Sequence, residues 1–277
     1  MGRSTKVTSS IQDKTTKKTS AKRKFGDSKN EKFFWWLGMM FIPVIWQIYS
    51  LFSESPLIVG PIEVAIASIG MIQDGTLVAA AGESGMVFLT GILAGVSLGL
   101  LLGLLIGRFR IVDLALDPYL SAIYATPLVA IVPLLVVALG FGFSAKVVIV
   151  MIFAFFPVVI NTAAGVRGVP VDLEELSKMY CSNELQSWRD IVLPSSLPFI
   201  ITGIRLAVGR ALIAVVVAEF STAVTGLGYL ILRKSRRFEM AESIVPVILL
   251  MITGFVLYNL LKKSEKKLAP WATEVRV

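Results

Sequence analysis

The sequence contains no histidine and a single cysteine, Cys181. These absences exclude a Ser-His-Asp triad, a His/Cys metal site and a disulfide framework within the chain. No GxxxxGK[ST] motif occurs either, so a nucleotide that drives this protein must bind to another chain. We therefore expect no enzymatic activity, no catalytic residue, no metal and no cofactor in the chain itself.

Charge is also scarce, because charged residues make up 17% of the 277 residues whereas 55% are hydrophobic. Soluble domains carry about 25% charged residues. Several stretches approach the roughly 20 apolar residues that a helix needs to cross a bilayer, and the alternating pattern of a transmembrane β-barrel is absent. The composition predicts an all-α, polytopic membrane protein.

The hydrophobic pattern divides the chain into a polar arm, six spans and a short tail. Residues 1–32 carry ten Lys or Arg against three acids, which predicts a disordered cytoplasmic arm near anionic lipid rather than a nucleic-acid-binding segment. Residues 33–52 are the expected first transmembrane helix, and 53–85 are an external segment with one or two short interfacial helices. Five further spans are expected within 86–261, at 86–107, 119–143, 147–166, 197–223 and 243–261, before a tail at 262–277.

The bias of Lys and Arg in the short loops sets the orientation. It places both the N-terminus and the C-terminus in the cytoplasm. One loop disagrees, because four positive charges between the last two spans fall on the external side of the six-span arrangement. These are Arg233, Lys234, Arg236 and Arg237. The positive charges at the two ends of the chain outnumber them.

The span at 86–107 carries no charge and has four glycines spaced four residues apart, Gly91, Gly95, Gly99 and Gly103. This spacing puts small residues on one helix face, where a second helix can approach closely. Packing within one subunit and a dimerisation seam both explain the stripe, and we favour the first.

A charged, patterned segment interrupts the apolar chain at Glu174–Pro194, EELSKMYCSNELQSWRDIVLP. Asp172 followed by Glu175 resembles an N-cap with its capping box, and the apolar residues then form two stripes at helical spacing. We expect two short amphipathic helices joined by a turn near Cys181. Between residues 172 and 190 there are five acids and two basic residues. That balance suits a knob that docks a protein better than a hairpin lying on anionic lipid.

This segment resembles the EAA loop of binding-protein-dependent ABC importer permeases. The stretches LDPYLSAIYATPLVAIVPLL, FFPVVINTAAGVRGV, LPFIITGIRLAVGRALIAVVVAEF and TGLGYLI resemble the nitrate/sulfonate/taurine branch of that family. The resemblance covers about 56–261 and implies the six-helix fold of type I importer permeases in a prokaryotic inner membrane, with a cytoplasmic coupling loop at 170–194. It implies three partners: an ABC ATPase that binds ATP and Mg, an extracytoplasmic binding protein, and a second copy of the chain in a homodimer.

The function that the resemblance implies is translocation of a small, anionic solute such as a sulfonate, nitrate, taurine or bicarbonate. A thiamine-precursor-like organic solute is the alternative within the family. The resemblance also assigns ATPase-coupling residues, which are Glu174, Glu175, Leu176, Ser177, Cys181, Leu193 and Pro194.

Cys181 stands where the family motif has glycine, and Glu175 occupies its acidic position. If that glycine adopts a left-handed conformation, a cysteine there costs on the order of 1 kcal/mol.

Polar residues inside or beside the expected spans are candidates for the translocation pathway or gate, because charged groups at membrane depth pair or line a pathway. These candidates are Asn161, Arg205, Arg210 and Glu219. Gly226 and Gly228 are further candidates for the gate, because Gly226-Leu227-Gly228 resembles the external turn that follows the span at 197–223 in the family. Arg210 suits an anion since a guanidinium binds oxyanions through two hydrogen bonds, although an internal pairing also explains it. The rival function is an ion-coupled secondary transporter that uses Arg210 and Glu219 as a relay.

Overall fold

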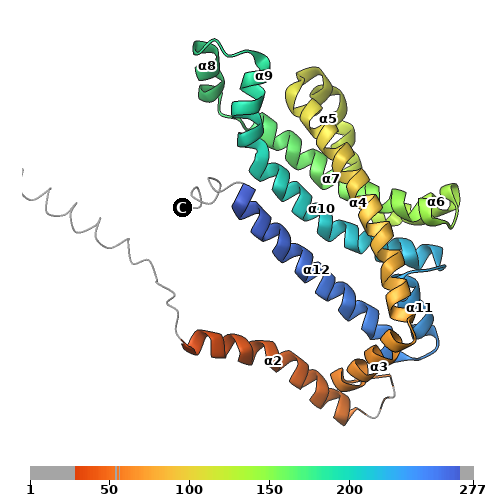
Figure 1. The fold of residues 1–277 in the computed structure, drawn as a ribbon. Helices are drawn as coiled ribbons and strands as arrows, with labels where there is room; N and C mark the ends of the chain where they lie inside the picture. The colour runs from red at the N-terminus through yellow and green to blue at the C-terminus, as the bar shows by residue number, and fades with distance from the viewer. Residues whose placement is uncertain (1–28, 54, 56, 269–277) are drawn as a thin grey trace, which may run out of the picture. The chain divides into compact units, whose positions relative to one another are not determined.

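The computed structural model describes residues 29–53, 55 and 57–268, and in these residues it contains helices and turns but no strand (Figure 1). The predicted arm falls largely outside the described residues, as does the end of the tail. The helices are α2 (Lys29–Phe52), α3 (Pro61–Gln73), α4 (Thr76–Arg108), α5 (Arg110–Ala125), α6 (Leu128–Leu139), α7 (Phe143–Arg167), α8 (Val171–Met179), α9 (Glu184–Ser187), the π-helical turn η1 (Trp188–Val192), α10 (Leu193–Thr222), α11 (Leu227–Arg236) and α12 (Met240–Leu268).

The chain forms two units, residues 1–49 and 50–277. Most of α2 belongs to the first unit, and the expected span at 33–52 falls in this helix. Its apolar part with described side chains is Met40–Phe52. The second unit holds every other helix and therefore all the candidate site residues.

The core of the second unit is built by three long helices, because α7 packs along both α4 and α10 (Figure 1). The apolar side chains between these three helices are fully buried, and several of them are small, which lets the helix axes approach closely. They include Ile149, Val150, Val158, Ala211 and Ala214. Of these helices α7 lies in the middle and contributes the most buried residues.

The glycine stripe of α4 faces α7. A Cβ built on Gly95 would lie 2.6 Å from the backbone oxygen of Met151, and one on Gly99 would lie 2.8 Å from Cβ of Val158. Only glycine fits such contacts without moving the backbone. The stripe therefore serves packing within the subunit, as we favoured from its spacing.

Four helices among the described residues are long and apolar enough to cross a membrane, namely α4, α7, the continuous helix that includes α10, and α12. The span expected at 119–143 is not a single continuous helix, because the end of α5 and the whole of α6 lie there, bent by 97° to each other. The break falls at Thr126, which is extended because the following residue is Pro127. Counting this bent pair as one span gives five.

The observed helices begin earlier than their expected spans, most clearly at α4. The helix expected from residue 86 starts at Thr76, inside the segment expected to be external, and it follows a left-handed turn at Gly75. The helix expected from residue 197 starts at Leu193 and continues η1 without a break. Both helices therefore extend at their N-termini into segments that were expected to precede the spans.

Candidate functional site

The segment predicted to couple to a partner forms two short helices at one end of the core, as expected (Figure 1). The second, α9, runs through η1 into α10, so the chain is helical from Glu184 to Thr222. The predicted cap at Asp172 is wrong, because α8 begins directly after Pro170 and Asp172 already lies inside the helix. A reciprocal capping box occurs instead at the start of α9, where Asn183 and Gln186 bond each other's backbone N–H groups at 2.8 and 2.9 Å.

The turn between α8 and α9 is a Schellman motif with Cys181 at its left-handed position. Cys181 has φ 51°. Its N–H donates to the carbonyl of Lys178, and the N–H of Ser182 donates to the carbonyl of Ser177, both at 3.0 Å. This pair of bonds closes helices that end in a left-handed residue, which is usually glycine. The glycine of the family motif therefore has a geometric reason, and the cysteine adopts the strained conformation.

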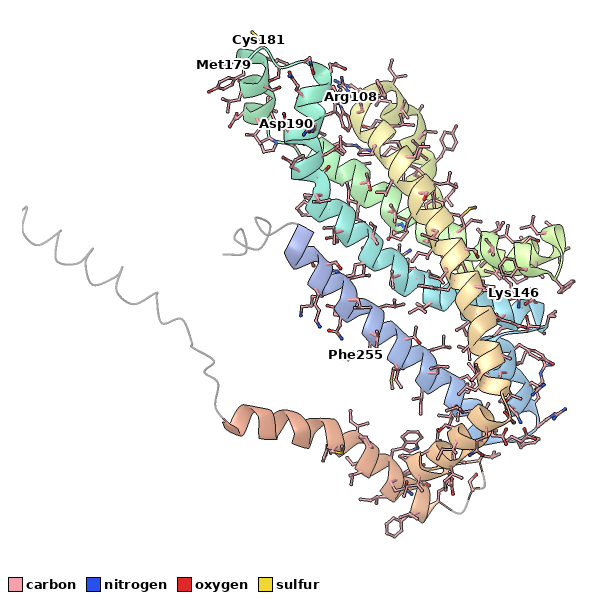
Figure 2. The ribbon with its side chains drawn as sticks, viewed as in Figure 1. Arg108, Lys146, Met179, Cys181, Asp190 and Phe255 are labelled. Carbon is pink, nitrogen blue, oxygen red and sulfur yellow. The ribbon has the colours of Figure 1, made fainter. Side chains whose placement is uncertain are left out.

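Apolar side chains project from the end of α8. Met179 and Tyr180 are each 80% exposed, and Cys181 lies beside them at the tip of the loop (Figure 2). Leu176 and Glu175 are exposed as well, whereas Ser177 is buried. The side chain of the remaining predicted acid, Glu174, is outside the described residues. A patch of this kind on a polar knob is typical of a surface that binds another protein.

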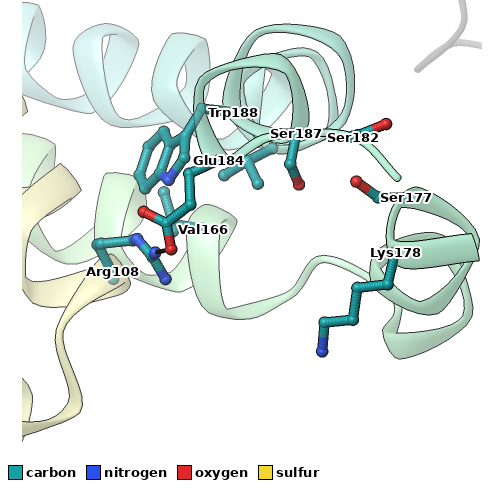
Figure 3. A pocket seen from close by; sticks show the side chains of 10 residues that line it. Arg108, Val166, Ser177, Lys178, Ser182, Glu184, Ser187 and Trp188 are labelled. Carbon is teal, nitrogen blue, oxygen red and sulfur yellow. Dashed lines mark hydrogen bonds and ion pairs between the residues drawn. The ribbon is translucent and has the colours of Figure 1, made fainter. Parts of the chain in front are cut away.

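The loop is tied to the end of α4. Arg108 Nη2 lies 2.5 Å from Glu184 Oε1, and the guanidinium is 5.9 Å from the ring centroid of Trp188. Both contacts line a cavity of about 380 Å³ between α4, α8 and η1 (Figure 3). Ser177 and Lys178 form its opposite wall. α9 is therefore linked to α4 through side chains and to α10 through the backbone.

Leu193 and Pro194 lie at the junction of η1 and α10. Proline has no N–H, so a regular α-helical turn would lose a hydrogen bond there. The π-helical turn accommodates this, since the N–H of Leu193 donates to the carbonyl of Trp188, five residues earlier. The motif residues Leu-Pro therefore mark the point where the loop becomes the span.

The two arginines of α10 have different partners. Arg205 forms an ion pair with Glu265 near the end of α12. Arg210 donates from Nη2 to the hydroxyl of Tyr124 at 2.8 Å and lies 4.6 Å from that ring's centroid. Among the described side chains no carboxylate lies within ion-pair distance of Arg210, so the internal acid pairing considered from the sequence is not found. Through its bond to Tyr124, the positively charged guanidinium lies close to the break between α5 and α6.

Glu219 lies at the far end of α10 and is completely buried. Its carboxylate accepts hydrogen bonds from the Ser84 hydroxyl and from the N–H of Gly228, both at 2.7 Å. Gly226, at φ 104°, packs directly on the same carboxylate. The structure thus brings together three predicted residues, Glu219, Gly226 and Gly228.

The side-chain amide of Asn161 bonds within its own helix. Its Nδ2 donates to the carbonyl of Pro157 in the same helix at 2.7 Å. Its Cβ lies against Gly203 of α10, where a further Cβ would be 3.0 Å away. Asn161 therefore contributes to the contact between α7 and α10.

The basic loop that conflicts with the expected orientation has local acidic partners. Lys234 Nζ lies 2.7 Å from Glu239 Oε2 and also pairs with Glu242. These hydrogen bonds, to Glu239 first and then to Glu242, raise the pKa of Lys234 above its ordinary value. The same bond lowers the pKa of Glu239. Local pairing therefore neutralises part of this positive charge.

Comparison with known proteins places the chain in a family. The model of the family described as "binding-protein-dependent transport system inner membrane component" matches residues 95–269, which include the loop and both arginines of α10. The chain belongs to this family. It is the permease component of an ABC importer, and it resembles the sulfonate/nitrate/bicarbonate branch.

Three relatives illustrate the branch. The chain is 30% identical to the putative aliphatic sulfonates transport permease protein SsuC of Bacillus subtilis, over 92% of this chain and 94% of that one. It is 29% identical to the formylaminopyrimidine transport permease protein ThiX of Halalkalibacterium halodurans (85% and 94% covered). It is 28% identical to the bicarbonate transport system permease protein CmpB of Synechocystis (80% and 74% covered).

A solved structure supports the fold. The chain aligns with a crystal structure of an amino acid ABC transporter with a TM-score of 0.55 and 15% identity, over 73% of this chain and 97% of that one. The all-α, polytopic fold predicted from the sequence is confirmed by this likeness and by the family.

Sequence reasoning missed three residues that complete the two sites. The predicted site residues did not include Arg108, Ser84 or Lys146. Lys146 is 3% exposed on α7, where its Nζ donates to the carbonyl oxygen of Thr225 at 2.8 Å. A lysine close to the end of an expected span gives no sequence signal that separates it from an ordinary boundary charge.

Proposed function

We propose that this permease imports a small, anionic solute delivered by an extracytoplasmic binding protein, and that a separate ABC ATPase drives it through the loop at 170–194. ATP and Mg are bound by that ATPase, and this chain holds no cofactor. The chain works as a homodimer in the lipid bilayer, with the loop and both termini in the cytoplasm. It catalyses no reaction itself.

The observation that carries the coupling role is the unbroken helix from Glu184 to Thr222. A force applied to α9 moves the start of α10 directly, because α9, η1 and α10 are continuous. α8 is joined to α9 by the hydrogen-bonded turn at Cys181. The bond between Arg108 and Glu184 carries the same movement to α4. Exposed Met179, Tyr180 and Leu176 provide the apolar surface that a partner protein would cover.

Arg210 supports an anionic solute. Its guanidinium has no carboxylate partner among the described side chains, and the Tyr124 hydroxyl occupies only one of its five donors. The remaining donors suit an oxyanion such as a sulfonate, nitrate or bicarbonate. The names of relatives include a sulfonate and a bicarbonate transporter but also a formylaminopyrimidine transporter. An organic solute of that kind is therefore the second candidate.

The ion-coupled secondary transporter gains no support from the geometry. Arg210 bonds Tyr124, whereas Glu219 bonds Ser84 and Gly228 nine residues further along α10. No bond among the described residues joins the two charges into a relay. The family to which the chain belongs transports with the help of a binding protein.

The coupling role is tested by Glu175→Lys. Reversing an exposed charge on α8 leaves the fold intact, so we expect normal membrane insertion but at least about tenfold weaker capture of the cognate ATPase, as for a charge that contributes about 1.4 kcal/mol to an interface. The measurement is co-purification of the ATPase with the permease from detergent extracts.

Asp190→Lys is the matched control. It makes the same charge change at an exposed acid of the same segment, on η1 rather than α8, and we expect it to capture the ATPase nearly as well as the parent chain. Equal capture by the parent and by Glu175→Lys, with unchanged stimulation of ATP hydrolysis, would contradict the role of α8 in docking.

A further inference from the structure

The turn between α10 and α11 is held to the membrane core by a buried carboxylate. Glu219 accepts from Ser84 Oγ and from the N–H of Gly228, and the Ser84 oxygen in turn accepts from the N–H of Leu227, each at 2.7 Å. Three hydrogen bonds therefore join α10, α4 and the start of α11. Ser84 and Glu219 are 135 residues apart in the sequence.

A buried cation fixes the other half of the same turn. Lys146 Nζ donates to the carbonyl oxygen of Thr225 at 2.8 Å and to its hydroxyl at 3.0 Å. Lys146 lies on α7, so the turn is bonded to all three helices of the core. We call Glu219, Ser84 and Lys146, with their bonds to this turn, the clamp.

The backbone of the turn is fitted to the carboxylate. A Cβ on Gly226 would overlap the carboxylate of Glu219, and one on Gly228 would lie 2.9 Å from the Cβ of Glu219. Gly226 also has φ 104°, which side chains rarely adopt. Both glycines are therefore required for the turn to lie on Glu219.

In the clamp, both carboxylate oxygens of Glu219 accept a hydrogen bond. Both groups that face them, a hydroxyl and an N–H, act as donors, which suits an ionised Glu219. Burying a carboxylate and an ammonium is unfavourable unless hydrogen bonds compensate. Apolar packing could hold a turn without this penalty, so the charged clamp indicates that the position of the turn matters.

We propose that Glu219 is a positioning residue for transport, and this rests on the function proposed above. The clamp makes the turn 225–228 move together with α4, α7 and α10. With its 30 residues α10 is about 45 Å long, and the coupling loop lies at its other end. Displacement of the loop therefore reaches the opposite face of the core.

The clamped turn also shapes a cavity. Val224 and Thr225 line a hollow of about 280 Å³ together with Phe141, Phe143 and Met86, which belong to the α6–α7 junction and to α4. Lys146 also lines this cavity. When displacement of the loop moves the core together with the clamped turn, the exposure of the cavity changes.

The experiment places a reporter in the wall of this cavity. Val224 is half exposed at the cavity. The labelling of Val224→Cys by a membrane-impermeant maleimide is measured in liposomes that hold the permease with its ATPase and binding protein. The rate is compared with and without vanadate-trapped nucleotide. The chain without the reporter gives the labelling due to Cys181.

With the clamp intact, we expect trapping to change the labelling rate about tenfold. In Glu219→Gln the amide is the same size as the carboxylate but presents a donor to one of its two donor partners, so the clamp opens. The loss of a buried hydrogen bond shifts a two-state equilibrium by about tenfold. The labelling rate should therefore become nearly independent of nucleotide, while ATP hydrolysis continues.

Two further variants make the result decisive. Ser84→Ala keeps the charge of Glu219 but removes two bonds of the clamp, the one from Ser84 to Glu219 and the one from Leu227 to Ser84. It should therefore show the same loss even if Glu219→Gln does not assemble. Ser221→Ala is the control, since the Ser221 hydroxyl bonds only the carbonyl of Val217 in its own helix. It should respond like the parent.

The two proposals fail in different ways. A nucleotide response that survives in both Glu219→Gln and Ser84→Ala overturns the clamp and leaves the ATPase coupling intact. A parent complex without any nucleotide response overturns the proposed function, and the clamp with it.

Discussion

At the scale of the residue, Cys181 occupies a backbone conformation that the family motif reserves for glycine. It ends α8 at φ 51° within a Schellman motif. This conformation costs a non-glycine residue about 1 kcal/mol. The turn is kept because the bonds from Cys181 and Ser182 to the last carbonyls of α8 close the helix.

Cys181→Gly should therefore stabilise the protein. We expect the free energy of unfolding of the loop to rise by about 1 kcal/mol, measured as greater protection of the α8 amides from hydrogen exchange. Cys181→Ser retains a Cβ and should show no gain. Less protection in the glycine variant than in the parent would mean that the cysteine side chain stabilises the turn by a contact of its own.

Arg210 is the residue that supports the proposal of an anionic solute. Arg210→Gln should lower uptake of an anion such as taurine or nitrate by about tenfold or more, since a hydrogen bond to a charged group contributes about 1.5–3 kcal/mol. ATPase assembly should be unchanged. The measurement is uptake of the labelled anion into liposomes that contain the complete transporter.

Tyr124→Phe is the matched control for Arg210. It removes the hydroxyl that accepts from the guanidinium and keeps both the charge and the ring below it. It should leave uptake within a few-fold of the parent. Normal anion uptake by fully assembled Arg210→Gln would exclude the arginine from the pathway.

The sequence identified the chemically unusual residues better than their partners. Glu219 and Arg210 stand out as charges within an apolar helix, and Cys181 stands out against a motif. Ser84, Lys146 and Tyr124 are ordinary residues of their segments. They lie at the candidate sites only because α4, α5 and α7 bring them against α10 and the turn that follows it, across long sequence separations. Local sequence patterns do not report such contacts.

At the scale of the element, composition and hydrophobic periodicity predicted the long helices but not the breaks between helices. The glycine stripe correctly indicated close packing of α4, and the amphipathic stripes correctly indicated two short helices in the loop. The bend of 97° between α5 and α6 was missed. Proline is tolerated inside membrane helices, so Pro127 alone does not tell a kink from a corner.

The glycine stripe makes a sharp prediction for α4. Gly95→Ala should destabilise the protein by about 1–3 kcal/mol, because its Cβ would lie 2.6 Å from a backbone oxygen of α7 that cannot move alone. Gly85→Ala is the control in the same helix, where a Cβ meets open space. It should be neutral or stabilising by up to about 1 kcal/mol.

Thermal unfolding in detergent checks this pair. The packing account predicts a lower midpoint for Gly95→Ala and an equal or higher one for Gly85→Ala, relative to the parent. Equal midpoints for the two variants would show that α4 and α7 do not pack as closely as the glycine contacts require.

At the scale of the whole permease, α10 connects its two ends. The coupling loop joins its first residue without a break, Arg210 lies along its length, and Glu219 holds the turn at its far end. α4 runs beside it and is bonded at both ends, through Arg108 to the loop and through Ser84 to the clamp. This arrangement suits a component that receives movement from outside the membrane and has no energy source of its own.

The most direct test of this account is uptake into liposomes by the permease with and without its ATPase. We predict that the complete complex with binding protein imports the solute only with ATP, and that vanadate abolishes this import. The permease alone should import nothing, with or without an ion gradient. Vanadate-insensitive uptake by this chain alone would contradict the account.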